Sequence, residues 1–118
     1  LDFAATLQTF AHPRYEIIAT GQVYAGPDEV NGYYATSRAA IPDQRNEIRA
    51  LHNADDAVIV EFDLLGTHLG ELQGIPPTGK SFRVPMIAVF MFGDGDCIVC
   101  ERVYFDTATF MRQLGLAG

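Results

Sequence analysis

Basic residues are scarce in this chain, and the resulting charge balance excludes several classes of partner. The 118 residues include 8 Lys and Arg against 15 Asp and Glu, which gives a formal net charge of −7 at pH 7. The Lys and Arg residues stand apart and form no basic cluster. Because phosphate backbones and anionic membrane surfaces would be repelled, we expect no nucleic-acid partner and no membrane partner.

Long hydrophobic runs are also missing. The longest apolar run spans Met86–Phe92, and it is far too short to cross a bilayer, since a membrane-spanning helix needs about 20 apolar residues. No signal peptide is visible, although Leu1 is not a natural start and some sequence can precede it. We therefore expect a soluble, cytoplasmic protein that handles a small molecule.

Cysteine is rare, and the two cysteines do not form a convincing reactive pair. Cys97 and Cys100 have the spacing of a CxxC motif, which in redox or zinc sites brings both thiols to one point. Here the flanking apolar residues indicate a β-strand, in which positions i and i+3 point to opposite faces. No second Cys/His pair is present to complete a metal site. We expect a structural role for these cysteines, no metal and no cofactor.

The pattern of apolar residues and breakers predicts one α+β domain over residues 1–118. Pro27 and the acidic residues after it mark a helix start, and Gly115 marks a helix end. The elements that we expect are helices at 2–11, 26–40 and 110–114, and strands at 15–19, 44–53, 56–72, 82–92 and 97–105. Helices first and long strands after favour helices packed on one face of a bent antiparallel sheet.

The last two expected strands define a face that carries one ionisable group. Asp94-Gly95 is typical of a two-residue type I′ hairpin turn. That turn would pair Phe90 with Val99, Ala88 with Glu101, and Met86 with Val103, all on one face. A carboxylate among these apolar neighbours would be desolvated, which raises its pKa and suits a general acid or base. Glu101 is therefore the first candidate catalytic residue, and its reach to water or a neighbouring His or Tyr is the structural alternative.

Further polar residues are weaker candidates. His68 stands where a strand meets a Pro-Pro loop, so it is either a catalytic group or a residue that pins the loop through its ring nitrogens. Tyr33 and Tyr34 share a helical stripe with Ser37, where core packing competes with a ligand-facing hydroxyl. Glu61 and Asp63 alternate with apolar residues, which places both on the outer face, within reach of Arg102.

Two segments carry a family resemblance. Residues 65–85 read LGTHLGELQGIPPTGKSFRVP, and the C-terminal part reads ERVYFD followed by MRQLG. Together they resemble the SnoaL-like polyketide cyclases of the nuclear-transport-factor-2-like superfamily. The resemblance implies a curved, mostly antiparallel sheet that forms a cone, with helices packed on its concave face and one further helix ahead of those expected here. It also implies an apolar ligand cavity lined by Met86, Ala88 and Val103.

The chain departs from this family at the position that matters for chemistry. The cyclases have their acid/base Asp where this chain has Val103, and they have Gln and His where it has Met86 and Ala88. Their aldol mechanism is therefore not carried over. Two function classes stay open: a proton-transfer enzyme of the isomerase or cyclase kind that uses Glu101, and a non-catalytic module that binds a hydrophobic ligand in the same cavity.

The residues expected to bind a ligand extend beyond the family pattern, and the outer face points to self-association. The ligand-binding candidates are Met86, Ala88, Phe90, Val103, Tyr33 and Tyr34. On the other face, Ile87, Val89 and Met91 are apolar although no helix is expected there. Since such a strip usually marks an interface, we expect a homodimer through the outer sheet faces, with Arg102 and Tyr104 at the contact.

Overall fold

A single curved sheet dominates the computed structural model, which describes residues 14–93 and 98–116. Its six strands lie in the order β2-β1-β6-β5-β4-β3. The strands are β1 (Arg14–Ile17), β2 (Gln22–Ala25), β3 (Arg45–Asn53), β4 (Ala57–Thr67), β5 (Ser81–Phe92) and β6 (Ile98–Phe105). All neighbouring pairs are antiparallel except β1 and β6, which run parallel. The expected mixed, mostly antiparallel sheet of an α+β fold is confirmed.

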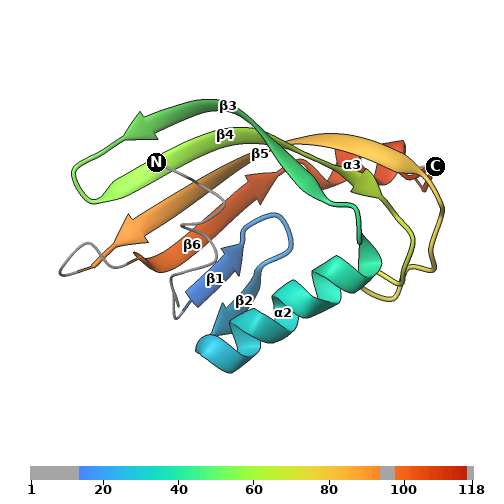
Figure 1. Ribbon diagram of the computed structural model, residues 1–118, viewed down its shortest axis with the longest axis horizontal. Coiled ribbons are helices and arrows are strands. Elements are labelled where there is room, and N and C mark those ends of the chain that lie inside the picture. The colour runs from blue at the N-terminus through green and yellow to red at the C-terminus, as the bar shows by residue number, and fades with distance from the viewer. Residues whose placement is uncertain (1–13, 94–97, 117–118) are drawn as a thin grey trace.

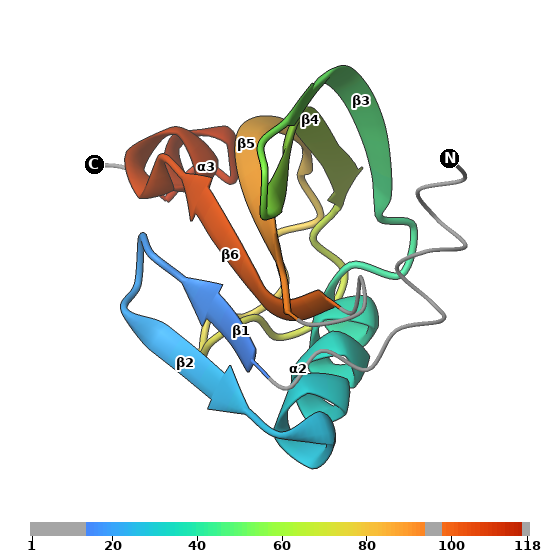
Figure 2. The same cartoon turned by 90° about the vertical axis from the view of Figure 1, so that its left-hand side faces the viewer.

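Two helices in the described part of the chain pack against this sheet. The sheet arches over α2 (Pro27–Ala40), which lies along its concave side, as Figure 1 shows. The view in Figure 2 shows the β1–β2 hairpin beside α2, at the opposite edge of the sheet from β3. Helix α3 (Thr107–Gln113) packs on β5 near the end of the chain. The space between α2 and the arch is where a ligand site can form.

Local sequence explains where both helices begin and end. Gly26 has a positive φ of 86° before Pro27, whose fixed φ suits the first turn of a helix. Asp28 and Glu29 lie at the positive end of the helix dipole. Helix α2 ends at Ala40, two residues before a proline. Helix α3 begins at an Asp106 cap, whose Oδ1 accepts a hydrogen bond of 3.0 Å from the amide of Ala108.

The core consists of two clusters of buried apolar side chains under the arch. The larger cluster joins the concave face of the sheet to the start of α2, and it contains Tyr15, Ile17, Val30, Val60, Phe62, Ala88, Phe90, Ile98 and Val103. The smaller cluster joins α3 and the end of α2 to β5, and it contains Ala40, Ile41, Phe82, Val84, Phe110 and Leu114. Helix α2 therefore contributes to both clusters, whereas α3 contributes to the smaller one.

The β5–β6 pairing differs from the expected register by two residues. Ala88 lies opposite Val103, and Phe90 lies opposite Glu101. A shift of two residues keeps each side chain on its face, because side chains alternate with a period of two. The expectation that Glu101 shares a face with Met86 and Ala88 therefore holds, although the predicted partners were wrong.

A β-bulge accounts for the error at the start of β6. Met91 pairs with Cys100 but Phe92 pairs with Ile98, so Val99 is left over on the bulged strand. Val99 is exposed, with 39% of its surface accessible, whereas Ile98 joins the larger core cluster. The sequence-based assignment of Val99 to the inner face and Ile98 to the outer face was wrong, because an inserted residue reverses the alternation.

Other expectations met mixed outcomes. Strand β2 was missed, and the expected strand over residues 56–72 ends at Thr67. The helix expected over residues 2–11, the turn at Asp94-Gly95 and the side chain of Cys97 lie outside the described residues. Cys100 is buried.

Candidate functional site

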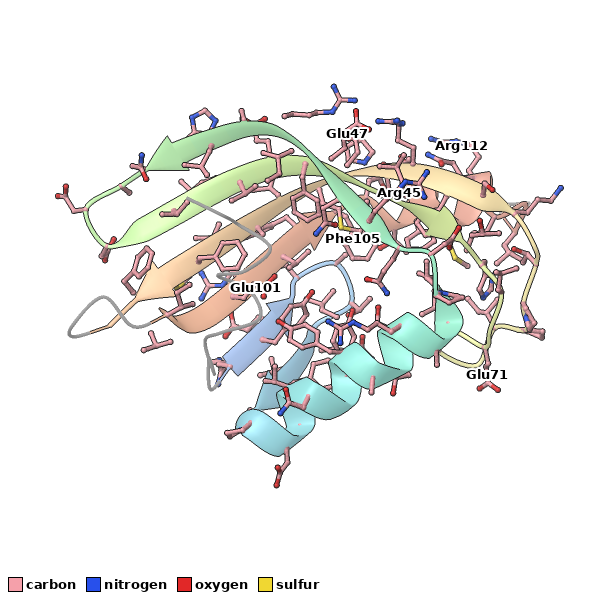
Figure 3. The ribbon with its side chains drawn as sticks, viewed as in Figure 1. Arg45, Glu47, Glu71, Glu101, Phe105 and Arg112 are labelled. Carbon is pink, nitrogen blue, oxygen red and sulfur yellow. The ribbon has the colours of Figure 1, made fainter. Side chains whose placement is uncertain are left out.

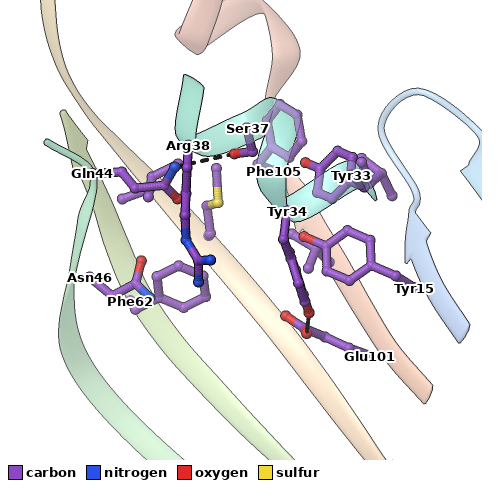
Figure 4. Close-up of a pocket in the computed structure, with 14 residues that line it drawn as sticks. Tyr15, Tyr33, Tyr34, Ser37, Arg38, Gln44, Asn46, Phe62, Glu101 and Phe105 are labelled. Carbon is purple, nitrogen blue, oxygen red and sulfur yellow. Dashed lines mark hydrogen bonds between the residues drawn. The ribbon is translucent and has the colours of Figure 1, made fainter. Parts of the chain in front are cut away.

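A cavity of about 370 Å³ lies between α2 and the concave face of the sheet (Figure 4). That volume is within the range of about 300–1,000 Å³ usual for small-molecule sites. The apolar part of its lining consists of Ile17, Phe62, Leu64, Met86, Val103 and Phe105. The polar part consists of Tyr15, Tyr33, Tyr34, Ser37, Arg38, Gln44, Asn46 and Glu101. The lining is therefore mixed, with apolar side chains beside hydroxyl, amide and charged groups at distinct places.

Glu101 is the carboxylate of this chamber. Strand β6 lies between β1 and β5, so Glu101 is flanked by Tyr15 on one side and Phe90 on the other. Only 8% of its surface is exposed. Figure 3 shows Glu101 on the concave side of the sheet and Glu47 on the convex side. Because β6 lies between two other strands, the sheet fixes the position of the Glu101 carboxylate.

Tyr34 is the hydrogen-bond partner of that carboxylate. Its hydroxyl donates to Oε1 of Glu101 at 2.9 Å, across the space between α2 and β6. Burial and the nearby negative charge of Glu101 raise the pKa of Tyr34 well above its ordinary value. The phenol is therefore protonated at neutral pH and donates to the carboxylate, which is an orientation suited to holding a general base in place.

The tyrosines around this pair form a packed aromatic group. The ring centroid of Tyr15 lies 4.9 Å from that of Tyr33 and 5.6 Å from that of Tyr34. Tyr24 continues the group, with its centroid 4.7 Å from Tyr33. Burial raises the pKa of Tyr33 to about 12 and that of Tyr15 well above its ordinary value. These hydroxyls are donors at neutral pH and give the chamber neutral polar groups beside one carboxylate.

The opposite side of the cavity carries different chemistry. In Figure 4, Arg38 from α2 and Asn46 from β3 lie near Phe62, away from the Tyr34–Glu101 pair. Gln44 links this region to the helix, because its amide donates to the hydroxyl of Ser37 at 3.3 Å and to the carbonyl of Ile41 at 3.2 Å. One end of the cavity is thus acidic and phenolic, and the other is cationic and amidic.

The structure brings together five of the eight residues predicted for the site. Glu101, Tyr33, Tyr34, Met86 and Val103 all line the cavity. Ala88 and Phe90 lie on the same face of the sheet, but they are covered within the larger core cluster and do not line it.

His68, the remaining predicted residue, lies outside the lining. It is fully buried, and its Nδ1 accepts a hydrogen bond of 3.3 Å from the amide of Thr78. The backbone of His68 also bonds to Gly79 and Lys80. These contacts hold the Pro-Pro loop against the end of β4, which is the structural alternative considered for this residue.

Several lining residues were not predicted. Arg38 follows Tyr34 by four positions on α2, so helical spacing places both on one face. This spacing could have predicted Arg38 as a lining residue from the sequence. Asn46 enters the lining only because β3 pairs it with Leu64, and Tyr15 enters through the parallel pairing of β1 with β6. These two depend on long-range strand pairings that no local pattern encodes.

The outer face of the sheet carries a separate set of charges. Asp63 forms ion pairs with Arg49 and with Arg83, the latter at 2.8 Å. The guanidinium of Arg49, followed by that of Arg83, holds the pKa of Asp63 below its ordinary value. The expected contact of Arg102 with the β4 acids was wrong, because Arg102 pairs with Glu16 on β1 at 2.6 Å.

Residues 14–93 and 98–116 contain no group of three or more His, Cys, Asp or Glu side chains placed to hold a metal ion. They also contain no helix of the length and hydrophobicity needed to cross a membrane.

Comparisons with known proteins agree on one family. The family model for SnoaL-like polyketide cyclases matches residues 3–114. No curated protein matches the chain.

Solved structures share the fold at low sequence identity. A SnoaL-like protein from Jannaschia sp. CCS1 is 21% identical with a TM-score of 0.83, over 98% of this chain and 78% of its own. A protein with a ketosteroid isomerase-like fold from Catenulispora acidiphila, in complex with trimethylamine, is 24% identical with a TM-score of 0.74, over 96% and 81%. IdmH from Streptomyces antibioticus, whose proposed activity is that of a polyketide cyclase, is 25% identical with a TM-score of 0.73, over 96% and 87%.

Proposed function

Because the chain belongs to the SnoaL-like polyketide cyclase family, we propose that it transfers a proton on an apolar carbonyl compound held under the arch of the sheet. One observation carries the proposal: the buried carboxylate of Glu101 faces the cavity and accepts the hydroxyl of Tyr34 at 2.9 Å. A positioned carboxylate that faces a ligand-sized cavity is the equipment of a general base. Family membership makes an isomerase or cyclase reaction plausible, and the site supplies the group that would perform it.

The reaction begins with removal of a proton from a carbon next to the substrate carbonyl. An oxygen of Glu101 takes the proton, and the electron pair of the C–H bond moves into the carbonyl, giving an enolate. In an isomerisation, the proton returns from Glu101 to another carbon of the conjugated system. In a cyclisation, the enolate carbon attacks a second carbonyl of the same substrate, and the new alkoxide takes the proton. Both routes restore the carboxylate, so no cofactor is consumed.

Tyr34 acts as a positioning residue in this scheme. Its phenol stays protonated because burial and the neighbouring carboxylate raise its pKa. It therefore donates to Glu101 throughout the cycle and fixes the direction of the carboxylate. The aromatic rings of Tyr15 and Tyr33 pack beside it and hold the phenol in place.

The proposal is tested with a bicyclic ketone, 2-tetralone, whose C1 protons are acidified by both the carbonyl and the ring. Loss of the C1 signal in D₂O, followed by NMR, reports proton abstraction directly. We expect the wild type to accelerate the exchange and Glu101→Gln to lose about 100-fold of that acceleration, the scale of general-base catalysis. A Glu101→Gln variant that is folded and as active as wild type would refute proton transfer by Glu101.

One observation favours a second candidate, a non-catalytic module that binds a hydrophobic ligand. Val103 occupies the position of the family's acid/base Asp, and it lines the cavity only as an apolar surface. Under this alternative, 2-tetralone binds in a fluorescence or calorimetric titration, but neither the wild type nor any variant accelerates its exchange.

The outer sheet face supports a proposed homodimer. Ile87 and Tyr104 lie opposite each other on β5 and β6, and each has about two fifths of its surface exposed, 40% and 39%. A second copy packed face to face would cover both, since self-complementary faces give two-fold dimers. Sedimentation of the wild type should give a dimer, and Ile87→Asp should give a monomer. A monomeric wild type at micromolar concentration would end this proposal.

A further inference from the structure

Arg38 is the one cationic side chain in the lining of the cavity as the structure describes it. Among residues 14–93 and 98–116, its guanidinium makes no hydrogen bond or ion pair, whereas Arg49, Arg83 and Arg102 all contact carboxylates. Its place is therefore unlike that of the arginines on the outer face. A guanidinium presents several N–H donors in a fixed plane that matches an anionic oxygen group.

Asn46 extends this donor set from the facing strand. It belongs to β3, pairs with Leu64, and lines the same cavity from the side opposite α2. Its side-chain amide, which can donate two hydrogen bonds, makes none to the part of the chain that the structure describes. Figure 4 places Arg38 and Asn46 at one side of the cavity and Glu101 at the other. A ligand that spans the cavity meets the carboxylate of Glu101 at one end and the N–H donors of Arg38 and Asn46 at the other.

An ordinary role for Arg38 has to be weighed. It lies in the last turn of α2, where a positive charge stabilises the helix dipole. That role needs only a charge near the helix end, and it does not require a side chain directed into a cavity. The side chain lies four positions after Tyr34 and so shares its face of the helix, which brings the cation to the chamber that holds the carboxylate.

We propose that the cavity binds an organic anion, with its acidic oxygen group on Arg38 and Asn46 and its apolar body against Phe62 and Met86. This inference rests on the proposed function only in taking the anion as the substrate's own substituent. It narrows the substrate class to apolar carbonyl compounds that carry a carboxylate or a similar group at the end remote from Glu101. The net charge of −7 would repel such a compound, and Arg38 supplies the local attraction that offsets this.

A matched pair of dyes isolates the charge. 1-Anilinonaphthalene-8-sulfonate and N-phenyl-1-naphthylamine share one skeleton and differ by the sulfonate. In fluorescence titrations at fixed ionic strength, we expect Arg38→Gln to weaken binding of the sulfonate dye about tenfold and to change binding of the uncharged dye less than about twofold. Arg38→Lys should recover part of the loss, since a lysine keeps the charge without the planar donor set. Asn46→Ala should weaken the sulfonate dye by a smaller factor.

Arg45→Gln is the control, because it removes the same charge from an exposed arginine that does not line the cavity. An equal loss for Arg45→Gln and Arg38→Gln would show a general charge effect and overturn the anion site. Equal losses for both dyes in Arg38→Gln would overturn it as well. The titrations involve no catalysis, so they separate the two proposals. If Arg38→Gln selectively weakens the sulfonate dye but wild type does not accelerate 2-tetralone exchange, only proton transfer is refuted. If wild type accelerates the exchange but Arg38→Gln does not selectively weaken the sulfonate dye, only the anion site is refuted.

Discussion

The two faces of the sheet each bury one carboxylate, and they treat it differently. On the concave face, Glu101 is 8% exposed and meets a neutral phenol. On the outer face, Asp63 is 1% exposed and meets two guanidinium groups. Burial alone therefore does not distinguish the candidate base from a structural charge.

The partners decide the difference. Two cations neutralise Asp63, and its lowered pKa keeps it ionised and unable to take up a proton near neutral pH. Glu101 accepts a hydrogen bond from the neutral hydroxyl of Tyr34, and the cavity beside it gives a substrate access. A buried carboxylate is thus a better candidate for acid/base work when a space adjoins it than when guanidinium groups cover it.

The largest expected contrast between the faces is in activity. Glu101→Gln should lower 2-tetralone exchange about 100-fold, whereas Asp63→Asn should change it less than about twofold. Both substitutions replace a carboxylate by an amide of equal size, so they match each other in shape and charge. If both variants are equally folded by circular dichroism and lose the same fraction of exchange activity, the two carboxylates do not differ in function.

Alkaline pH should weaken the concave face. The pKa of Tyr33 is raised to about 12 in the folded protein, so between about pH 10 and 12 the folded state retains a proton that the unfolded chain loses. The stabilisation linked to this phenol is complete below pH 10 and is lost as the pH rises through 12. In urea unfolding, wild type should lose up to about 1.4 kcal/mol per pH unit relative to Tyr33→Phe over this interval. If the free energies of unfolding of wild type and Tyr33→Phe change equally between pH 10 and 12, the prediction is wrong.

Removal of single hydroxyls tests the positioning of the base. Tyr34→Phe removes the donor to Glu101 and should lower kcat for exchange about tenfold, with KM within about twofold, because the carboxylate loses its orientation but the cavity keeps its shape. Tyr33→Phe removes a hydroxyl of the same helix that hydrogen-bonds with Tyr15, and it should cost less than about threefold. A larger loss of kcat in Tyr33→Phe than in Tyr34→Phe would show that Tyr34 is not the positioning residue.

The outer face should respond to acid, with a smaller effect. Asp63→Asn should destabilise the protein by about 1 kcal/mol at pH 7, since the covering arginine side chains are themselves about half exposed and screened by water. Because the folded pKa of Asp63 is lowered, this contribution is present above its ordinary pKa and is lost as the pH falls through the folded value. The difference between variant and wild type should therefore vanish in acid. A constant difference down to pH 2 would show that charge is not its cause.

Much of the fold could be predicted because the residues that begin and end its helices can be recognised in the local sequence. Pro27 and the acids after it mark α2, and Gly115, with a positive φ of 77°, ends α3. Strands β4, β5 and β6 carry strong apolar patterns, whereas β2 has four residues and a half-exposed pattern that no period distinguishes. Its existence depends on pairing with β1.

The site was predictable on one strand and hidden elsewhere. Alternation along β6 correctly placed Glu101 and Val103 on the inner face. The two-residue error in the β5–β6 register left this assignment unchanged, because side chains alternate with a period of two. The bulge after Ile98 lies beside residues 94–97 and left no signature in the sequence. Arg38 and Asn46 come from elements whose exposed, polar sequences resemble solvent-facing surface. Only the tertiary arrangement places them in the cavity.

The parallel pairing of β1 with β6 also has a consequence for biosynthesis. Tyr15 emerges from the ribosome early, and the strand that carries Glu101 emerges after five other strands. Strand β6 joins the β1–β2 hairpin to the rest of the sheet, so a nascent chain stopped before it holds two disconnected pieces. Such a high-contact-order closure is slow and comes late in folding. The chamber therefore closes around its carboxylate only after β6 has been made, and a chain truncated before β6 has neither a continuous sheet nor a base.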